Sequence, residues 1–183
     1  MIFSETSIPG AYLVELELRE DERGFNARAW CARELEDQGL TSSIAQVNLL
    51  HNRRRGTVRG MHYQAAPHAE AKLFRVTRGA VHDVIVDVRP GSSTYGRSEG
   101  FRLSADVPTM LYVPEGCAQG FQTLEDDTDL VYLTSAFYAP EAERGFRHDD
   151  PAFVIEWPLP VEVVSVKDRS WPDFALEQPA VAT

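Results

Sequence analysis

Short segments in which apolar and polar residues alternate recur along the chain and restrict the folds it can adopt. The alternation has the two-residue period of a β-strand with one buried face. Turn-forming stretches such as RRRGT, TRGA, RPGSSTYG, PEG, EDDTD and HDDP separate the segments. Short strands broken this often are typical of a sandwich or barrel, and we predict an all-β jelly roll. The predicted strands are YLVELEL (12–18), IAQVNLL (44–50), KLFRV (72–76), VHDVIVDV (81–88), GFRLS (100–104), TMLYVP (109–114), GFQTL (120–124), DLVYLTS (129–135) and AFVIEWP (152–158).

One helix completes the predicted organisation. CARELEDQG (31–39) carries a helical pattern and ends at a glycine, as many helices do. No internal repeat, low-complexity segment or linker divides the chain, so we expect residues 1–183 to form a single domain. The final residues, EQPAVAT, carry neither pattern, and we expect a loose tail over about 174–183.

The net charge of −10 excludes several classes of partner. The only basic run is Arg53-Arg54-Arg55, which is too small for a nucleic-acid footprint and is most simply interpreted as a solvated loop. An anionic ligand must therefore be small and held by a few cations. No apolar run approaches the roughly 20 residues that a membrane span requires.

Two further features favour a cytoplasmic protein. The start, MIFSETSIPG, has neither the basic region nor the apolar region of a secretion signal. Cys31 and Cys117 form no metal motif and no disulfide framework, so we expect both thiols to be reduced packing residues.

Ionisable side chains are concentrated in VRGMHYQAAPHAEAKLFRV (58–76), and they raise the question of a metal site. Jelly rolls of the cupin type usually bind metal through a His-x-His pair, a later glutamate, and a histidine after a Pro-x-Gly turn. Here His62 is followed two residues later by Gln64, and the turn at 114–116 is followed by Gln119. A glutamine amide is a poor substitute for imidazole or carboxylate. The sequence therefore does not favour a metal, and proton transfer beside cations remains.

Candidates for proton transfer have ordinary structural interpretations when each is taken alone. His62 on a strand could be a hydrogen-bonded core histidine, Tyr132 a packing aromatic and Asp168 a surface charge. Lys72 is different, because the alternation in KLFRV (72–76) places it on the same face as two apolar residues. If that face is the core, a buried lysine requires a functional reason.

A set of motifs in a fixed order changes this interpretation. They are DERGF (21–25), QVN (46–48), VRGMHYQ (58–64), KLFRVTRGAVHDVIVDVRPGSSTYG (72–96), VPEG (113–116), YAPEAERGFRHDDPAF (138–153) and SVKDR (165–169). Together they resemble the dTDP-4-dehydrorhamnose 3,5-epimerase family, over roughly residues 1–172.

The resemblance implies a cupin-type jelly roll that works as a homodimer without a metal or organic cofactor. It implies a nucleotide-linked 4-keto-6-deoxy sugar as substrate, inverted at the carbons next to the ketone. His62 corresponds to the base that removes the proton, and Asp168 to the carboxylate that orients it. Lys72 corresponds to the cation beside the ketone oxygen, and Tyr132 to the acid on the opposite face.

The resemblance also implies how the nucleotide is held. Arg59, Gln46 and Asn48 match residues that hold the diphosphate, and Arg23 matches a contact from the neighbouring subunit. Phe25 and Tyr138 are further candidates for contact with the substrate.

Departures from the family pattern leave part of the function open. Gln119 stands where the family has a histidine that faces an aspartate, here Asp83, so inversion of only one carbon is an alternative. Arg28 replaces a carboxylate that faces the nucleotide, so a CDP- or GDP-linked sugar is another. LRGLH has become VRGMH, a mild repacking at Met61. Two other classes are a non-catalytic sugar-nucleotide binding relative and a metal-dependent cupin isomerase or oxygenase, which would require the metal set described above.

Overall fold

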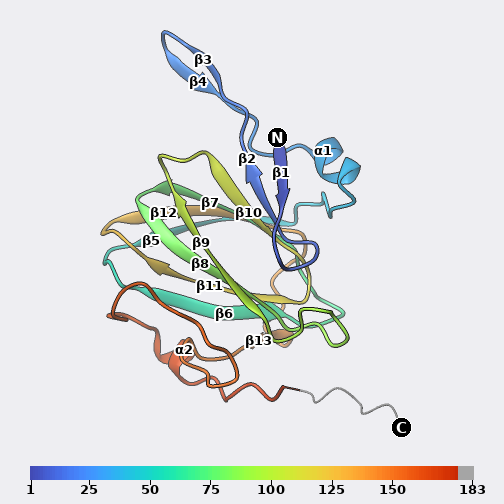
Figure 1. The fold of residues 1–183 in the computed structure, drawn as a ribbon, viewed down its shortest axis with the longest axis vertical. Coiled ribbons are helices and arrows are strands. Elements are labelled where there is room, and N and C mark those ends of the chain that lie inside the picture. Colours follow the sequence, from blue (N-terminus) through green and yellow to red (C-terminus); the bar gives the residue numbers. More distant parts are fainter. Residues whose placement is uncertain (177–183) are drawn as a thin grey trace.

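The computed structural model describes residues 1–176, which fold into two facing β-sheets and a separate hairpin (Figure 1). The six-stranded sheet has the order β1 (Ile2–Glu5), β2 (Tyr12–Glu15), β10 (Thr109–Val113), β7 (Lys72–Arg78), β12 (Thr128–Thr134) and β5 (Gln46–Asn52). The five-stranded sheet has the order β13 (Glu143–Gly145), β6 (Val58–Gln64), β11 (Cys117–Thr123), β8 (Ala80–Asp87) and β9 (Ser98–Ser104). All pairings between these strands are antiparallel, so the prediction of an all-β jelly roll is confirmed.

The main core lies between the two sheets, because alternate residues of each strand point inward. Phe74 and Val76 of β7 pack against Ile85 of β8 and Phe121 of β11, and all four side chains are buried. The rings of Phe74 and Phe121 lie 5.5 Å apart. This arrangement confirms that KLFRV presents Lys72, Phe74 and Val76 on one inward face.

The predicted helix is present as α1 (Ala32–Asp37), and it covers the outer face of the six-stranded sheet. Leu35 is its buried residue and packs with Val14, Leu73 and Met110 from three strands of that sheet. A second helix, α2 (Val166–Arg169), lies beside the five-stranded sheet at the opposite end of the molecule (Figure 1). The sequence does not predict α2, because one turn of helix has no measurable periodicity.

The strand predicted at AFVIEWP (152–158) is wrong, because this segment forms turns and irregular structure. Phe153 packs with Phe146 and Phe174 in a second cluster that includes Val84 and Val86 of β8. The alternation here comes from a loop packed on a sheet, not from a strand within it.

The loose tail expected over about 174–183 does not include Phe174. Phe174 packs on Phe146, and its backbone N–H donates to the buried carboxylate of Asp150 at 2.7 Å. The rest of the predicted tail, 177–183, lies outside the described residues.

A two-stranded hairpin of β3 (Arg19–Asp21) and β4 (Gly24–Asn26) projects away from both sheets (Figure 1). Its side chains are exposed, and Phe25 keeps 62% of its surface open to solvent. A large apolar side chain at the end of a projecting hairpin is typical of a segment that contacts another molecule.

Both cysteines are free thiols: Cys117 is buried and Cys31 is half-buried at the start of α1. None of the helices within residues 1–176 is long and apolar enough to cross a membrane.

Candidate active site

A cavity of about 680 Å³ lies between the two sheets. One wall comes from β5, β7 and β12 of the six-stranded sheet, and the other from β6 and β11 of the five-stranded sheet, with β13 and α2 beside it. Of the residues predicted for the site, those that line this cavity are Gln46, Asn48, Arg59, His62, Lys72, Gln119, Tyr132, Tyr138 and Asp168. The structure therefore brings together residues from seven elements of the chain or the loops beside them.

An irregularity in β6 allows both Arg59 and His62 to reach the cavity. In a regular strand, residues three apart lie on opposite faces. Here the pairing of β6 with β11 shifts between the His62–Gln119 and Arg59–Phe121 pairs, so two residues of β6 oppose one of β11. Gly60 makes this bulge, with φ of +105° and no room for a side chain, because a Cβ would lie 2.6 Å from the Gln119 carbonyl oxygen.

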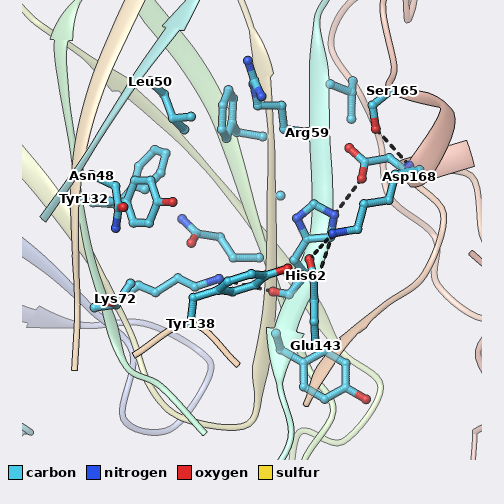
Figure 2. A pocket seen from close by; sticks show the side chains of 18 of the residues that line it. Asn48, Leu50, Arg59, His62, Lys72, Tyr132, Tyr138, Glu143, Ser165 and Asp168 are labelled. Carbon is cyan, nitrogen blue, oxygen red and sulfur yellow. Dashed lines mark hydrogen bonds and ion pairs between the residues drawn. The ribbon is translucent and has the colours of Figure 1, made fainter. Parts of the chain in front are cut away.

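His62 is held by a buried carboxylate. Its Nε2 lies 2.7 Å from Oδ1 of Asp168, whose side chain is 6% exposed (Figure 2). Asp168 is fixed by α2, where its backbone N–H donates to the Oγ of Ser165 at 3.0 Å. Burial acts to raise the pKa of Asp168, but the hydrogen bond and charge of His62, together with hydrogen bonds to Gly60 and Ser165, outweigh it and keep that pKa below its usual value. The carboxylate is therefore ionised, and Nδ1 of His62 is the ring nitrogen that remains for a substrate.

Tyr132 and Lys72 come from the sheet opposite His62. Figure 2 shows Tyr132 and Asn48 on one side of the cavity and His62 and Asp168 on the other. The Tyr132 ring stacks on Phe74 with the ring centres 6.0 Å apart. Burial raises the pKa of Tyr132, and the nearby Glu70 carboxylate adds to this, so the phenol keeps its proton at neutral pH. A base on one wall and a protonated phenol on the other can act on opposite faces of a bound molecule.

Lys72 is a largely buried cation with a buried carboxylate beside it. The Nζ of Lys72 lies 3.4 Å from Oε1 of Glu70, and the two side chains are 13% and 11% exposed. It also donates to the backbone carbonyl of His62 at 3.5 Å, which fixes it near the base. Burial raises the pKa of Glu70, while the charge of Lys72 opposes that effect. The sequence assigns no role to Glu70, and the structure places it in the cavity wall.

The side chain of Gln119 is hydrogen-bonded to the buried carboxylate of Asp83. Its Nε2 donates to both carboxylate oxygens of Asp83, at 3.1 and 3.0 Å, so its amide oxygen is directed away from that carboxylate. Asp83 is fully buried and does not line the cavity itself. Burial raises its pKa to about 8, against the opposing effects of the Gln119 hydrogen bond and the Lys72 charge. Asp83 is therefore a support for Gln119 and not a direct substrate contact in this arrangement.

Tyr138 belongs to a polar network at the edge of the cavity. Its hydroxyl donates to Oε2 of Glu143 at 2.6 Å, and Lys167 donates to the same carboxylate at 2.6 Å (Figure 2). The backbone N–H of Tyr138 donates to Oε1 of Gln46 at 2.7 Å, which leaves the Gln46 amide nitrogen for another partner. Tyr138 is 54% exposed at this edge of the cavity, and its contact with the substrate stays a prediction.

The hairpin residues predicted to contact the substrate lie outside the cavity of their own chain. Arg23 pairs with Asp21 at the hairpin end, and Phe25 is exposed there. Arg28 follows the hairpin and pairs with Glu34 of α1 at 2.6 Å. The roles of Arg23, Phe25 and Arg28 in substrate binding stay predictions.

Several cavity residues were missed by sequence reasoning: Gln64, Glu70, Glu143 and Lys167. Gln64 could have been found, because it lies two residues after His62 on the same strand face. Glu143 and Lys167 come from a three-residue strand and a one-turn helix, where no periodicity marks the side that faces the cavity. Among residues 1–176, no group of three His, Cys, Asp or Glu side chains is arranged to hold a metal ion.

Comparison with protein families gives one match over nearly the whole chain. The family model described as dTDP-4-dehydrorhamnose 3,5-epimerase matches residues 5–176. A dTDP-4-dehydrorhamnose 3,5-epimerase from Sinorhizobium fredii is 41% identical over 179 residues, which cover 95% of this chain and 90% of the relative. A dTDP-4-dehydro-6-deoxyglucose 3-epimerase from a Streptomyces species is 40% identical over 172 residues, which cover 92% of this chain and 87% of the relative.

Comparison with solved structures agrees with this. The crystal structure of dTDP-4-dehydrorhamnose 3,5-epimerase from Bacillus anthracis, with TDP and pyrophosphate bound, superposes with a TM-score of 0.91 at 38% identity. The match covers 94% of this chain and 99% of that one.

Proposed function

This chain belongs to the dTDP-4-dehydrorhamnose 3,5-epimerase family of carbohydrate epimerases, and from that premise we propose that it inverts both carbons next to the ketone of a dTDP-linked 4-keto-6-deoxyhexose. The observation that carries the proposal is the placement of the His62–Asp168 pair on one wall of the cavity and of Tyr132 and Lys72 on the other. Epimerisation requires a proton to leave one face of a carbon and return to the other.

Lys72 supplies the electrostatic part of the reaction. A proton next to a ketone is about ten pKa units less acidic than an imidazolium, which corresponds to roughly 14 kcal/mol at 1.36 kcal/mol per unit. A base alone cannot provide this free energy, so the negative charge that develops on the ketone oxygen must be stabilised. The ammonium of Lys72, with 13% of its side chain exposed, provides a cation with little competing water.

His62 removes the proton through Nδ1, because Nε2 is occupied by Asp168. The ionised carboxylate fixes the ring orientation and stabilises the imidazolium that forms, as second partners of catalytic histidines do. Tyr132 then donates its proton to the opposite face, since its raised pKa keeps it protonated until the carbanion forms.

The nucleotide is proposed to be thymidine diphosphate. The Bacillus anthracis relative has TDP bound, and Gln46, Asn48 and Arg59 provide amide and guanidinium donors in the cavity here. The alternative of a CDP- or GDP-linked sugar depended on Arg28 facing the nucleotide. In this chain the Arg28 guanidinium is instead paired with Glu34, so that alternative loses its support.

A second candidate function is inversion of one carbon only, and Gln119 favours it. The Gln119 amide is hydrogen-bonded to Asp83 and cannot transfer a proton at neutral pH. His62 is therefore the one imidazole among the described residues that line the cavity. The Streptomyces relative, a 3-epimerase, is as similar to this chain as the 3,5-epimerase from Sinorhizobium fredii, so identity does not separate the two.

The number of carbons can be measured as deuterium uptake. We expect dTDP-4-keto-6-deoxyglucose incubated with the enzyme in heavy water to gain two deuterons by mass spectrometry. One deuteron would select the single-carbon function, with NMR naming the carbon, and Gln119→His should then restore the second exchange. The matched control is Gln38→His on the surface, and no exchange at all by the wild-type protein would contradict a dTDP-linked substrate.

We also propose that the protein acts as a homodimer in the cytoplasm, in deoxysugar biosynthesis. Support for the dimer comes from the projecting β3–β4 hairpin, whose exposed Arg23 and Phe25 lie outside their own cavity. In the dimer they would reach the substrate of the neighbouring subunit.

Mixing two inactive variants tests this exchange of residues. Arg23→Ala and His62→Asn proteins should each lose most of their activity. When an equal mixture is refolded together, each heterodimer should contain one site with both residues intact, so up to about a quarter of all sites in the mixture should be active. The expected result follows because one subunit would supply Arg23 and the other His62. A mixture that stays inactive, although native mass spectrometry shows heterodimers, would contradict the shared site.

A further inference from the structure

Trp171 lies beside the proposed base, His62, and is not among the described residues that line the cavity. The centres of the two rings are 6.3 Å apart, and their planes meet at 60°. Trp171 follows α2 by two residues, so the segment that supplies Asp168 to Nε2 of His62 also supplies this ring. The function proposed above uses Asp168 but gives Trp171 no part.

A hydrogen bond at one nitrogen does not by itself fix the plane of an imidazole. The torsion between the Cβ atom and the ring of a histidine is broad, so the ring can turn while Nε2 stays close to a carboxylate oxygen. Removal of a proton from carbon requires the basic nitrogen to point at that carbon within a narrow range of angles. A side chain packed beside the ring supplies the second restraint that a single hydrogen bond lacks.

The strand next to His62 leaves room for the indole ring. Gly145 of β13 is opposite His62 of β6 in the pairing of these two strands. A Cβ atom on Gly145 would lie 2.7 Å from Cε2 and 2.9 Å from Nε1 of Trp171, and 2.6 Å from the carbonyl oxygen of Met61. The indole therefore fills the space that a side chain at position 145 would occupy, beside the proposed base.

The main chain is anchored on both sides of Trp171. Nη1 of Arg147 donates to the carbonyl oxygen of Trp171 at 3.3 Å, and the same nitrogen lies 2.6 Å from Oδ1 of Asp173. On the other side, the backbone N–H of Asp168 donates to the Oγ of Ser165 at 3.0 Å. These contacts hold the indole in place beside the imidazole.

The indole nitrogen indicates that Trp171 acts through packing. Among residues 1–176, this buried N–H has no hydrogen-bond partner. A buried tryptophan usually finds such a partner, so hydrogen bonding does not explain the orientation of this ring. Phenylalanine at this position would keep a planar ring and would remove no hydrogen bond within the described chain.

We propose that Trp171 is a positioning residue for the epimerisation, whose ring fixes the imidazole plane of His62 so that Nδ1 is directed at the proton to be removed. The inference rests on the proposed function, in which His62 is the base. Asp168 determines which nitrogen is free, and Trp171 determines where that nitrogen points. Because Trp171 does not line the cavity, its loss should slow the chemical step without weakening substrate binding.

The test is the kinetics of Trp171→Leu with dTDP-4-keto-6-deoxyglucose. We expect kcat to fall by about tenfold, because the base is less well aligned, while KM and the affinity for dTDP by calorimetry stay within about twofold of the wild type. Trp171→Phe, which keeps a planar ring, should retain most of the wild-type kcat. The matched control is Trp157→Leu, because Trp157 also lies beside a histidine, His82, with ring centres 6.3 Å apart, and neither residue lines the cavity. Its kcat should match the wild type, with circular dichroism confirming the fold of each variant.

A measurement on the imidazole itself requires no turnover. The ¹⁵N NMR spectrum of His62 should show one sharp set of ring signals in the wild type and in Trp171→Phe, and broadened signals in Trp171→Leu, because the ring turns in the leucine variant. A wild-type kcat or a sharp His62 spectrum in Trp171→Leu would overturn the inference, and so would a Phe variant as slow as the Leu variant. If the wild-type protein inverts no keto sugar, the proposed function fails, while the NMR comparison still decides whether Trp171 holds the imidazole.

Discussion

Replacing His62 with asparagine is expected to lower the rate of inversion by about a thousandfold, which is the usual contribution of a positioned general base. Asparagine keeps a polar side chain of smaller size but cannot accept a proton at neutral pH. Asp168 would lose its imidazole partner yet keep the hydrogen bond from its own backbone N–H to Ser165, so α2 should remain folded. The measurement is the initial rate of conversion of dTDP-4-keto-6-deoxyglucose by NMR, with circular dichroism to confirm the fold.

A matched control is available in the same segment. His68→Asn makes the same chemical change in the loop after β6, where the imidazole is 47% exposed and its one ion pair is a 3.9 Å contact with Glu141. Its rate should stay within about twofold of the wild type, as surface substitutions away from a site usually do. A His62→Asn protein that inverts at the wild-type rate would eliminate the proposed base.

Replacing Tyr132 with phenylalanine is expected to slow inversion by about two orders of magnitude while exchange of the proton with solvent continues. The base, the carboxylate that orients it and the cation at the ketone oxygen are all retained, so the carbanion can still form. Without the phenol, the proton can return only to the face from which it left. Stacking of the ring on Phe74 is kept, so the wall of the cavity should not change.

Two measurements on one sample separate removal of the proton from its return to the opposite face. Mass spectrometry in heavy water should show deuterium in recovered substrate, and NMR should show product reduced by about two orders of magnitude, within the range for loss of one proton-transfer group. Tyr12→Phe is the control, because Tyr12 contacts Phe3 through its ring on the outer part of the six-stranded sheet. Loss of both exchange and inversion would contradict the role of an acid on the opposite face, and so would unchanged inversion.

The sequence determined the class of fold, because strand alternation and turn residues act locally. KLFRV shows this best: its two-residue period placed Lys72 on the inward face beside Phe74, and the structure has it there. The same reasoning failed at AFVIEWP, because a loop packed on a sheet produces the same alternation as a strand. The motif resemblance added the candidate residues, although spacing alone gave His62, Tyr132 and Asp168 ordinary structural interpretations.

Only the tertiary structure decided how those candidates are arranged. The bulge at Gly60 turns Arg59 and His62 toward one cavity against the strand period, and glycine is required there because β11 passes too close for any side chain. Asp168 reaches His62 across 106 residues of sequence, and nothing in the sequence assigned Glu70 to the cavity wall. Periodicity records which face of a segment is buried. The periodicity does not say which distant segments contact each other. Those contacts are decided by the packing of the two sheets and of the one-turn helix α2.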